Sequence, residues 1–184
     1  VMIGGSFSGV DGFNRPNLAR LNANGSLDQT FNAGSAPAVS RIVGQADGKY
    51  LLITGGFSPT GMTRRNADGT TDPTFTAPAF SYFGSSSDMY LYSMLLQSDG
   101  SIIVGGRFSS VNGINRNNLV RLRSSGAVDS LFFANGANGA VRDMVLQTDG
   151  NVMLAGDFSR LSGSTRVGVA RILPGRFVGA AMID

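Results

Sequence analysis

A repeat of about fifty residues is the feature that most constrains the fold of this chain. A glycine-rich element that ends in phenylalanine occurs four times, and its phenylalanines are separated by 50, 51 and 50 residues at Phe7, Phe57, Phe108 and Phe158. Other elements recur in the same phase: Asp-Gly pairs at Asp47, Asp99 and Asp149, Asp-x-x-Phe at Asp28, Asp72 and Asp129, and arginines at Arg20, Arg121 and Arg171. Repeats of this length form propellers, solenoids or arrays, in which each repeat is one supersecondary unit.

The third repeat predicts four short antiparallel strands. Residues 91–97 form the first strand, and an Asp-Gly turn returns the chain as an apolar second strand that is covered on both faces. Residues 118–123 form a third strand, in which alternation predicts one wetter face, and residues 127–132 form the fourth. Four such strands, joined by short turns and followed by a longer crossover, make one propeller blade.

Composition agrees with an all-β chain and removes several kinds of chemistry. The 184 residues include 26 glycines and twelve aspartates, but one lysine and no glutamate, so common helix-surface residues are scarce. Without cysteine there is no disulfide framework or thiolate metal site, and without histidine the commonest general base is missing. No apolar run approaches the roughly 20 residues of a membrane-spanning helix. The first residues, VMIGG, align with the middle of a strand, so we do not expect them to be a natural start.

These motifs resemble the delta-60 repeat family, a bacterial β-propeller-like repeat with a DGK turn, a GGxF strand, an N-x-x-R-L strand and a D-x-x-F strand. Repeats one and three carry the pattern fully, for example in NLARLNANGSLDQTF at residues 17–31. Repeat two is six residues shorter between Phe57 and Gly69, and repeat four lacks the D-x-x-F element. The resemblance implies an array of about four four-stranded antiparallel blades.

We expect one domain over residues 1–184, with four blades. Their bounds are 1–34 plus 176–184 for blade one, 37–80 for blade two, 89–135 for blade three and 139–175 for blade four. Residues 178–183 align with a first strand and residues 1–5 with a second strand, so the two ends could pair and close the array. Closure would remove exposed sheet edges. The alternative is that both ends are cuts through a longer array.

The glycine motifs predict structure rather than cofactor or metal chemistry. An Asp-Gly pair once in each repeat suits a hairpin turn, whereas calcium loops need clustered aspartates that are absent from this sequence. The GG pairs end a strand and precede no helix, so they indicate close backbone packing and not a phosphate-binding loop. We therefore predict no metal site and no cofactor.

The fourteen arginines raise the question of nucleic-acid binding, but they are spread through the repeats and the net charge is only +3. This distribution favours structural roles and makes nucleic acid an unlikely partner. We expect Asp28, Asp72 and Asp129 to form cross-strand charge pairs with Arg20, Arg65 and Arg121, or to cap turn amides. In a closed ring, equivalent arginines would also form a weakly anion-attracting rim.

One insertion does not repeat, and it contains the candidate ligand-binding residues. Residues 81–92, SYFGSSSDMYLY, hold three of the four tyrosines. Tyr90 and Tyr92 flank Leu91 and are expected on the far face of the first strand. Tyr82 and Phe83 remain as aromatic side chains on a polar loop, a feature typical of surfaces that stack on sugars.

The sequence therefore predicts a non-enzymatic binding or scaffold module, secreted or displayed on a cell or virion surface, with a protein or glycan partner. The alternative is a purely structural component, either a fragment of a longer propeller or part of a phage or surface particle that associates through open blade edges. A hydrolase that uses carboxylates is the third class. Its candidates would be Asp11, Asp88, Asp143 and Asp157, but no pair of them is placed by the sequence, and we predict that the chain is not an enzyme.

Overall fold

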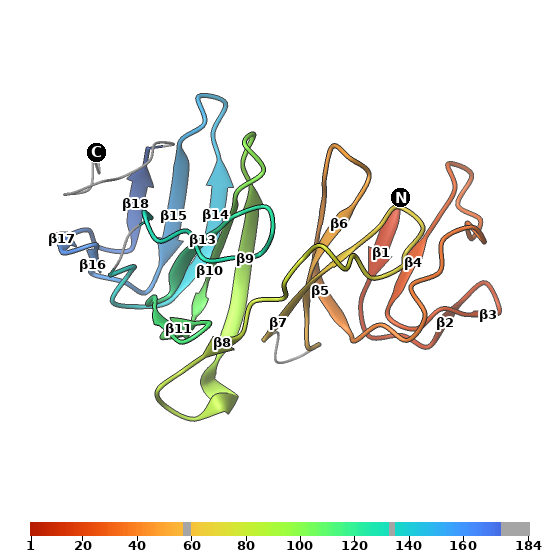
Figure 1. Cartoon of the computed structure of the whole chain (residues 1–184), viewed down its shortest axis with the longest axis horizontal. Coiled ribbons are helices and arrows are strands. Elements are labelled where there is room, and N and C mark those ends of the chain that lie inside the picture. The colour runs from red at the N-terminus through yellow and green to blue at the C-terminus, as the bar shows by residue number, and fades with distance from the viewer. Residues whose placement is uncertain (57–59, 133–134, 174–184) are drawn as a thin grey trace. The chain divides into compact units, whose positions relative to one another are not determined.

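The computed structural model describes residues 1–56, 60–132 and 135–173, and this part of the chain is built from short strands with one 3-10 turn at Ser86–Asp88 (Figure 1). All the paired strands in it are antiparallel. The chain divides into two compact units, Val1–Ala77 and Pro78–Asp184. The prediction of an all-β fold made of small antiparallel sheets is confirmed. The proposed blade bounds stay a prediction.

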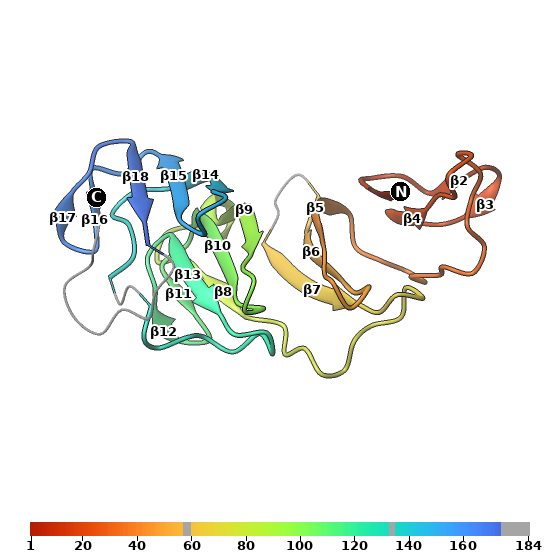
Figure 2. The same cartoon turned by 90° about the horizontal axis from the view of Figure 1, so that it is seen from above.

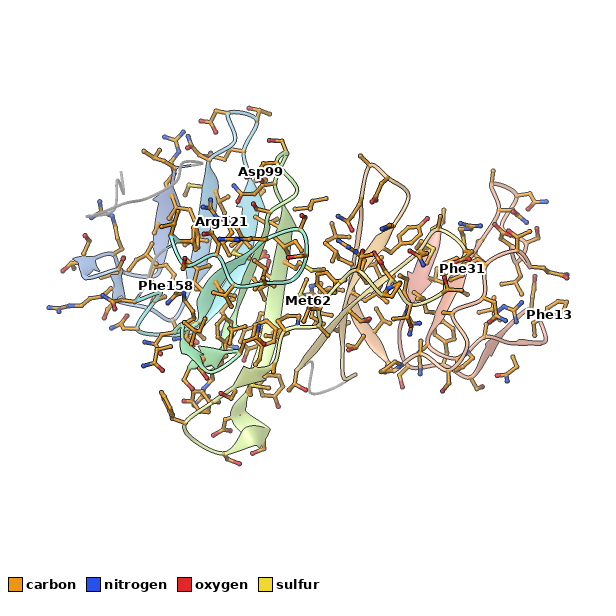
Figure 3. All side chains as sticks on the ribbon, in the orientation of Figure 1. Phe13, Phe31, Met62, Asp99, Arg121 and Phe158 are labelled. Atoms are coloured by element: carbon orange, nitrogen blue, oxygen red, sulfur yellow. The ribbon has the colours of Figure 1, made fainter. Side chains whose placement is uncertain are left out.

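The first unit contains two sheets and a small hairpin. The strands β1 (Met2–Gly4) and β4 (Leu18–Arg20) pair with each other, and the hairpin between them consists of β2 (Gly9–Val10) and β3 (Phe13–Asn14). The second sheet has the order β5-β6-β7, with β5 at Val39–Gly44, β6 at Tyr50–Thr54 and β7 at Gly61–Arg65. Phe31 is fully buried in the core of this unit, whereas Phe13 projects from the small hairpin (Figure 3).

The second unit repeats this plan twice. One sheet has the order β13-β10-β9, formed by β9 (Tyr90–Leu96), β10 (Ile102–Arg107) and β13 (Leu119–Leu122). The next has the order β14-β15-β18, formed by β14 (Val141–Leu146), β15 (Val152–Gly156) and β18 (Val169–Ile172), and these strands lie side by side in Figure 2. The shorter strands are β8 (Phe80–Ser81), β11 (Ser110–Val111), β12 (Ile114–Asn115), β16 (Arg160–Leu161) and β17 (Ser164–Thr165). As predicted, the second strand of a repeat is central, and residues Ile102 to Val104 are completely covered.

In repeats one to three the fourth element is shorter than the predicted strand. It pairs through one bridge, such as Leu21 with Leu27 or Leu122 with Val128, and then turns at the Asp-x-x-Phe sequence. In that turn the Oδ1 atom of Asp28 accepts a hydrogen bond from the Thr30 amide at 2.9 Å, and Asp129 does the same for Leu131 at 3.0 Å. A side chain that satisfies the backbone locally replaces the sheet ladder, so the chain turns instead of extending.

The aspartate of this turn is also ion-paired with an arginine eight residues earlier in the chain. The distances are 2.8 Å for Arg20–Asp28, 2.7 Å for Arg64–Asp72 and 2.7 Å for Arg121–Asp129. The two roles predicted for these aspartates as alternatives are therefore combined in one carboxylate. The same three arginines lie over the rings of Phe31, Phe75 and Phe132, at 5.1, 4.9 and 4.8 Å from the ring centres.

Two details of the arginine prediction are wrong. The partner of Asp72 is Arg64, because Arg65 points to the other side of its strand and bonds the Thr71 hydroxyl at 2.6 Å. The strand β13 also has no wetter face, since Arg121 is 4% exposed and its ion pair compensates its burial. In repeat four, which lacks the Asp-x-x-Phe element, Arg171 instead bonds Gln147 at 2.8 Å and Asp149 at 2.5 Å.

Neighbouring sheets within each unit meet at the first glycine of the GGxF element. A Cβ atom at Gly4 would lie 2.8 Å from side-chain atoms of both Val39 and Ile42 on β5. A Cβ atom at Gly105 would lie 2.8 Å from the Val141 side chain on β14. The prediction that these glycines mark close packing is confirmed. The absence of a side chain allows the next sheet to cover this face of the previous one.

The predicted pairing of residues 178–183 with residues 1–5 lies outside the described residues. It stays a prediction, as does the alternative that the array continues.

We predict that Gly105→Ala destabilises the second unit by about 1 to 3 kcal/mol, because the added methyl group overlaps the Val141 side chain in a packed core. Urea unfolding measures the effect. Gly44→Ala is the matched control, since no atom lies within 4 Å of its Cβ position. Equal stability of Gly105→Ala and the parent chain would contradict close packing at this position.

We also predict that stability is independent of pH from about pH 5 to 9 and falls below about pH 4. Hydrogen bonds from Thr30, followed by the bond from Arg20, lower the pKa of Asp28 to about 2, and those from Lys49 and Thr74 lower the pKa of Asp72. A carboxylate with a lowered folded pKa stabilises the fold fully above its unfolded pKa of 3.8, and this stabilisation is lost as the pH falls towards the folded value. Because the chain has no histidine, cysteine or glutamate, no side chain of ordinary pKa titrates in the neutral range. Thermal melting across this pH range tests the prediction, and a midpoint that changes between pH 6 and 8 would contradict it.

Candidate functional site

The second unit contains a cleft of about 620 Å³ at the end of its two larger sheets where β10 and β15 finish. It is lined by the insertion loop, the residues that follow β10, the turn before β13, the segment before β14 and the residue after β15. The lining residues are Tyr82, Phe83, Gly84, Arg107, Phe108, Ser109, Asn117, Asn118, Ala137, Asn138, Gly139, Ala140, Arg142 and Asp157. The insertion loop, between β8 and β9, extends from the rest of the unit in Figure 1.

The backbone segments that carry lining residues, here called the floor of the cleft, approach each other closely at glycines. A Cβ atom at Gly136, whose φ is 57°, would lie 2.0 Å from the Asn117 carbonyl oxygen. One at Gly139 would lie 2.5 Å from the Asp157 carbonyl oxygen. Side chains at these two positions would therefore separate the segment before β14 from the rest of the floor.

Two asparagines hold the same segments together. Asn118 accepts a hydrogen bond from the Phe108 amide at 3.2 Å and donates one to the Ala137 carbonyl at 2.8 Å. Asn138 accepts bonds from the amides of Ser159 and Arg160 at 2.9 and 2.8 Å. In repeat one, Asn17 bonds Phe7 and Ala36 in the same way as Asn118 bonds Phe108 and Ala137. The hydrogen bonds of Asn118 are therefore a property of the repeat.

One wall of the cleft consists of Arg107 and Tyr82. The Nε and Nη2 atoms of Arg107 donate to the Tyr82 hydroxyl at 3.3 and 3.2 Å, and the guanidinium carbon lies 5.1 Å from the ring centre. The Tyr82 hydroxyl raises the pKa of Arg107. An arginine that stacks on a ring and bonds its hydroxyl is restricted in its rotamers, so its position in the wall is defined.

A second wall consists of Arg142 and Asp157. The Nε and Nη2 atoms of Arg142 donate to Oδ2 of Asp157 at 2.9 and 2.6 Å. Arg142 is the extra residue of a β-bulge, because its neighbours Val141 and Asp143 pair with consecutive residues of β15. Bulges redirect side chains and occur often beside binding sites.

The bulge places the Arg142 guanidinium 4.7 Å from the centre of the Tyr92 ring, which stacks in turn on Tyr90 at 5.8 Å with an interplanar angle of 5°. Leu91 between these two tyrosines is 1% exposed. The prediction that Tyr90 and Tyr92 lie on the far face of the first strand is therefore confirmed. In the cleft they act indirectly, by supporting Arg142.

Both residues predicted from the insertion line this cleft. Tyr82 is half-buried under Arg107, and Phe83 is 82% exposed at the rim. Gly84 follows them, and a Cβ atom there would lie 2.7 Å from the Tyr82 ring, so a larger residue would displace the ring. The structure brings the two aromatics together with hydrogen-bonding groups, and their binding of a ligand stays a prediction.

Sequence reasoning missed Arg107 and Arg142 as members of a site. The equivalent positions between the first two repeats hold Ser6, between GG and Phe7 in repeat one, and Ser40, directly after Val39 in repeat two. Both positions vary along the chain, but arginine occupies both of them only here. This pairing of two cationic residues is a signal that a position-by-position comparison of the repeats could have found.

The other candidate residues have local roles. Asp47, Asp99 and Asp149 each accept a hydrogen bond from the amide two residues later, and the glycines after them have φ values of 81°, 81° and 83°. The prediction that these pairs form hairpin turns is confirmed. Asp143 accepts bonds from Ser93 and from the amide of Met144. Within residues 1–56, 60–132 and 135–173, no three acidic side chains are grouped to hold a metal ion, and no helix is long and apolar enough to cross a membrane.

The chain is similar to solved β-rich structures, at low identity. One is the crystal structure of a protein of unknown function from Bacteroides caccae, with 13% identity and a TM-score of 0.49; the match covers 94% of this chain and 53% of that chain. Another is a streptogramin B lyase, with 11% identity and a TM-score of 0.52, and coverage of 91% and 46% respectively. The chain thus spans about half the length of these structures. A search of curated proteins found no match.

The four repeats also match a family model, described as a β-propeller domain of unknown function, DUF5122. The matched segments are residues 1–31, 45–75, 97–132 and 147–175. They contain the Asp-Gly turns, the GGxF strands and the three Asp-x-x-Phe turns, which are the elements that the structure shows to organise each repeat. The chain therefore belongs to the DUF5122 β-propeller family.

Proposed function

We propose that this chain is a non-enzymatic binding module whose cleft in the second unit engages a glycan. The observation that carries the proposal is Phe83, which is 82% exposed at the rim of a cleft lined by arginine, asparagine and aspartate side chains. A large exposed aromatic ring costs free energy in water, and the apolar face of a sugar ring can cover it. Hydrogen-bonding groups beside the ring would orient the sugar hydroxyls.

The geometry also supports a glycan over a flat protein surface as the partner. The polar groups face into a cleft of about 620 Å³, a volume typical of small-ligand sites. The aromatic residues lie on a loop over a rigid sheet end, which is where binding residues commonly occur. A protein partner that inserts a loop is the other form of this proposal.

The absence of catalysis is part of the proposal. Glycoside hydrolysis ordinarily uses two carboxyl groups on either side of the bond that breaks. Asp157 is the single carboxylate among the lining residues of the cleft, and both Nε and Nη2 of Arg142 bond it. A site of this composition can hold a sugar but offers no second acid for its hydrolysis.

We further propose that the chain is a delta-60 repeat protein within its family and acts outside the cell, on a cell surface or on a virion. The GGxF and D-x-x-F elements support the first part. The second part is supported by the cysteine-free, glycine-rich composition.

We predict that the double variant Tyr82→Ala, Phe83→Ala loses glycan binding on an array of neutral and acidic glycans. The loss of two ring contacts should weaken binding by roughly 5- to 150-fold, since each stacked aromatic contributes on the order of 0.5 to 1.5 kcal/mol. Phe13→Ala is the matched control, because Phe13 is an exposed phenylalanine of the first unit, 43% exposed and distant in sequence from the cleft. Unchanged binding by the double variant, or no binding of any glycan by the parent chain, would refute the proposal.

A second candidate function is structural, and one apolar surface favours it. On the β14-β15-β18 sheet, Val145 is 58% exposed and Val169 is 54% exposed, beside a shallow groove lined by Met153 and Ala155. In the preceding sheet, the equivalent residues Leu95 and Leu119 pack into a core that includes Val141 and Met144 of β14. By this precedent, the occupant of the exposed surface would be the first strand of a further blade.

If this second function holds, the purified chain should self-associate, and Val145→Lys, Val169→Lys should return it to a monomer. Static light scattering over a range of concentrations measures both. Covering two valines contributes on the order of 3 kcal/mol, so their replacement by lysine should weaken association strongly. A parent chain that is monomeric at all concentrations would contradict the structural role and leave the binding role untouched.

A further inference from the structure

We propose that the glycan held in the cleft is acidic, with a sugar carboxylate bound by Arg107 and Arg142. This inference rests on the proposed binding function and adds the chemical class of its ligand.

The charge of the cleft favours an anion. Its lining residues include two arginines and one aspartate, which leaves one positive charge in excess. Asp88 lies close enough to Arg107 to interact with its charge, but it is not part of the lining. The two arginines line the same cleft, and their charges interact: the hydrogen bond to Asp157 raises the pKa of Arg142, whereas partial burial and the charge of Arg107 oppose that rise. A carboxylate between two like charges would relieve their repulsion.

Each guanidinium has a free edge for such a carboxylate. Arg107 bonds the Tyr82 hydroxyl through Nε and Nη2, and Arg142 bonds Asp157 through the same two atoms. In the part of the chain that the structure describes, the Nη1 atom of neither residue has a hydrogen-bond partner. Bonds from guanidinium to carboxylate are roughly twice as strong as neutral ones.

The two arginines are held in place before any ligand arrives. Arg107 stacks on Tyr82 and Arg142 stacks on Tyr92, which itself stacks on Tyr90. Each arginine is therefore restrained by an aromatic face on one side and by hydrogen bonds at its edge. Side chains that are already ordered lose less entropy on binding, so the carboxylate contacts contribute more of their strength to affinity.

A structural role does not account for these arginines. The equivalent positions of repeats one and two hold Ser6 and Ser40, and the corresponding strands β1 and β5 still form. The Arg142–Asp157 pair has side chains that are 52% and 56% exposed, and ion pairs at this exposure contribute little to stability. The repeated elements thus supply the backbone of the cleft, whereas the pair of arginines occurs at this one place in the chain.

The test compares sugars that differ only in charge. Trigalacturonate, a glucuronate oligosaccharide and sialyllactose serve as acidic probes, and the methyl esters of the same sugars are neutral partners of matched shape. Calorimetric titration of the full chain should show at least tenfold tighter binding of an acidic probe than of its ester. Higher salt should weaken the acidic probe more than the ester.

The variants Arg107→Gln and Arg142→Gln should each weaken the acidic probe by about tenfold more than they weaken its ester, because only the acid loses a charged contact. Arg41→Gln is the control, because Arg41 is an exposed arginine on β5 of the first unit. Melting curves verify that each variant is folded.

The outcomes separate this inference from the proposed function. Equal affinity for acid and ester, binding of neutral glycans only, or tighter acid binding that both arginine variants retain would overturn the acidic ligand and leave the glycan-binding function standing. Failure of the parent chain to bind any glycan would overturn both. Preference for the acid that falls in both arginine variants would support the inference.

Discussion

The carboxylate of the Asp-x-x-Phe turn is the interaction on which the rest of each complete repeat depends. In repeat three, Asp129 bonds the Leu131 amide and the Arg121 side chain, and Arg121 lies over the ring of Phe132. The turn, the third strand and the core are thereby joined through one side chain. Phe132 is 1% exposed as a result, and the crossover to the next sheet starts from a defined point. Repeat four lacks this turn, and its equivalent arginine, Arg171, forms an ion pair with Asp149 of the hairpin instead.

Sheets that are fixed in this way can pack closely, and their close packing creates the cleft. Gly105 lets β14 lie directly against β10, and Gly139 lets the segment before β14 reach the backbone of Asp157. The floor is therefore made of backbone and small side chains, with charged and aromatic groups left for the walls. The bulge at Arg142 then directs that side chain towards the cleft. Because the backbone of the cleft repeats and the side chains of its walls do not, one scaffold can carry a specific site.

Much of the fold could be predicted from the sequence because its determinants are local. A pair such as Asp99-Gly100 forms its turn through a bond to the residue two positions on, and the apolar run Ile102 to Val104 identifies a covered strand. The candidate site was predicted only in part. Tyr82 and Phe83 were found because they interrupt the repeat, whereas Arg107 and Arg142 were treated as ordinary members of a spread-out set of arginines. Arg64 was missed as the partner of Asp72 because neighbouring arginines point to opposite faces of a strand.

By itself, the sequence determined the all-β class, the period of the repeats, the hairpin turns and the existence of one aromatic insertion. These follow from backbone preferences and from side chains that act within a few residues of themselves. Only the tertiary structure decided that Tyr82 lies under Arg107 and that Arg142 lies over Tyr92, fifty residues earlier in the chain. These contacts depend on the register between two sheets and on a bulge that skips one residue of β14. The chemistry of the cleft is therefore a property of how the β13-β10-β9 and β14-β15-β18 sheets pack, because side chains that belong to different repeats meet only when the sheets that carry them do.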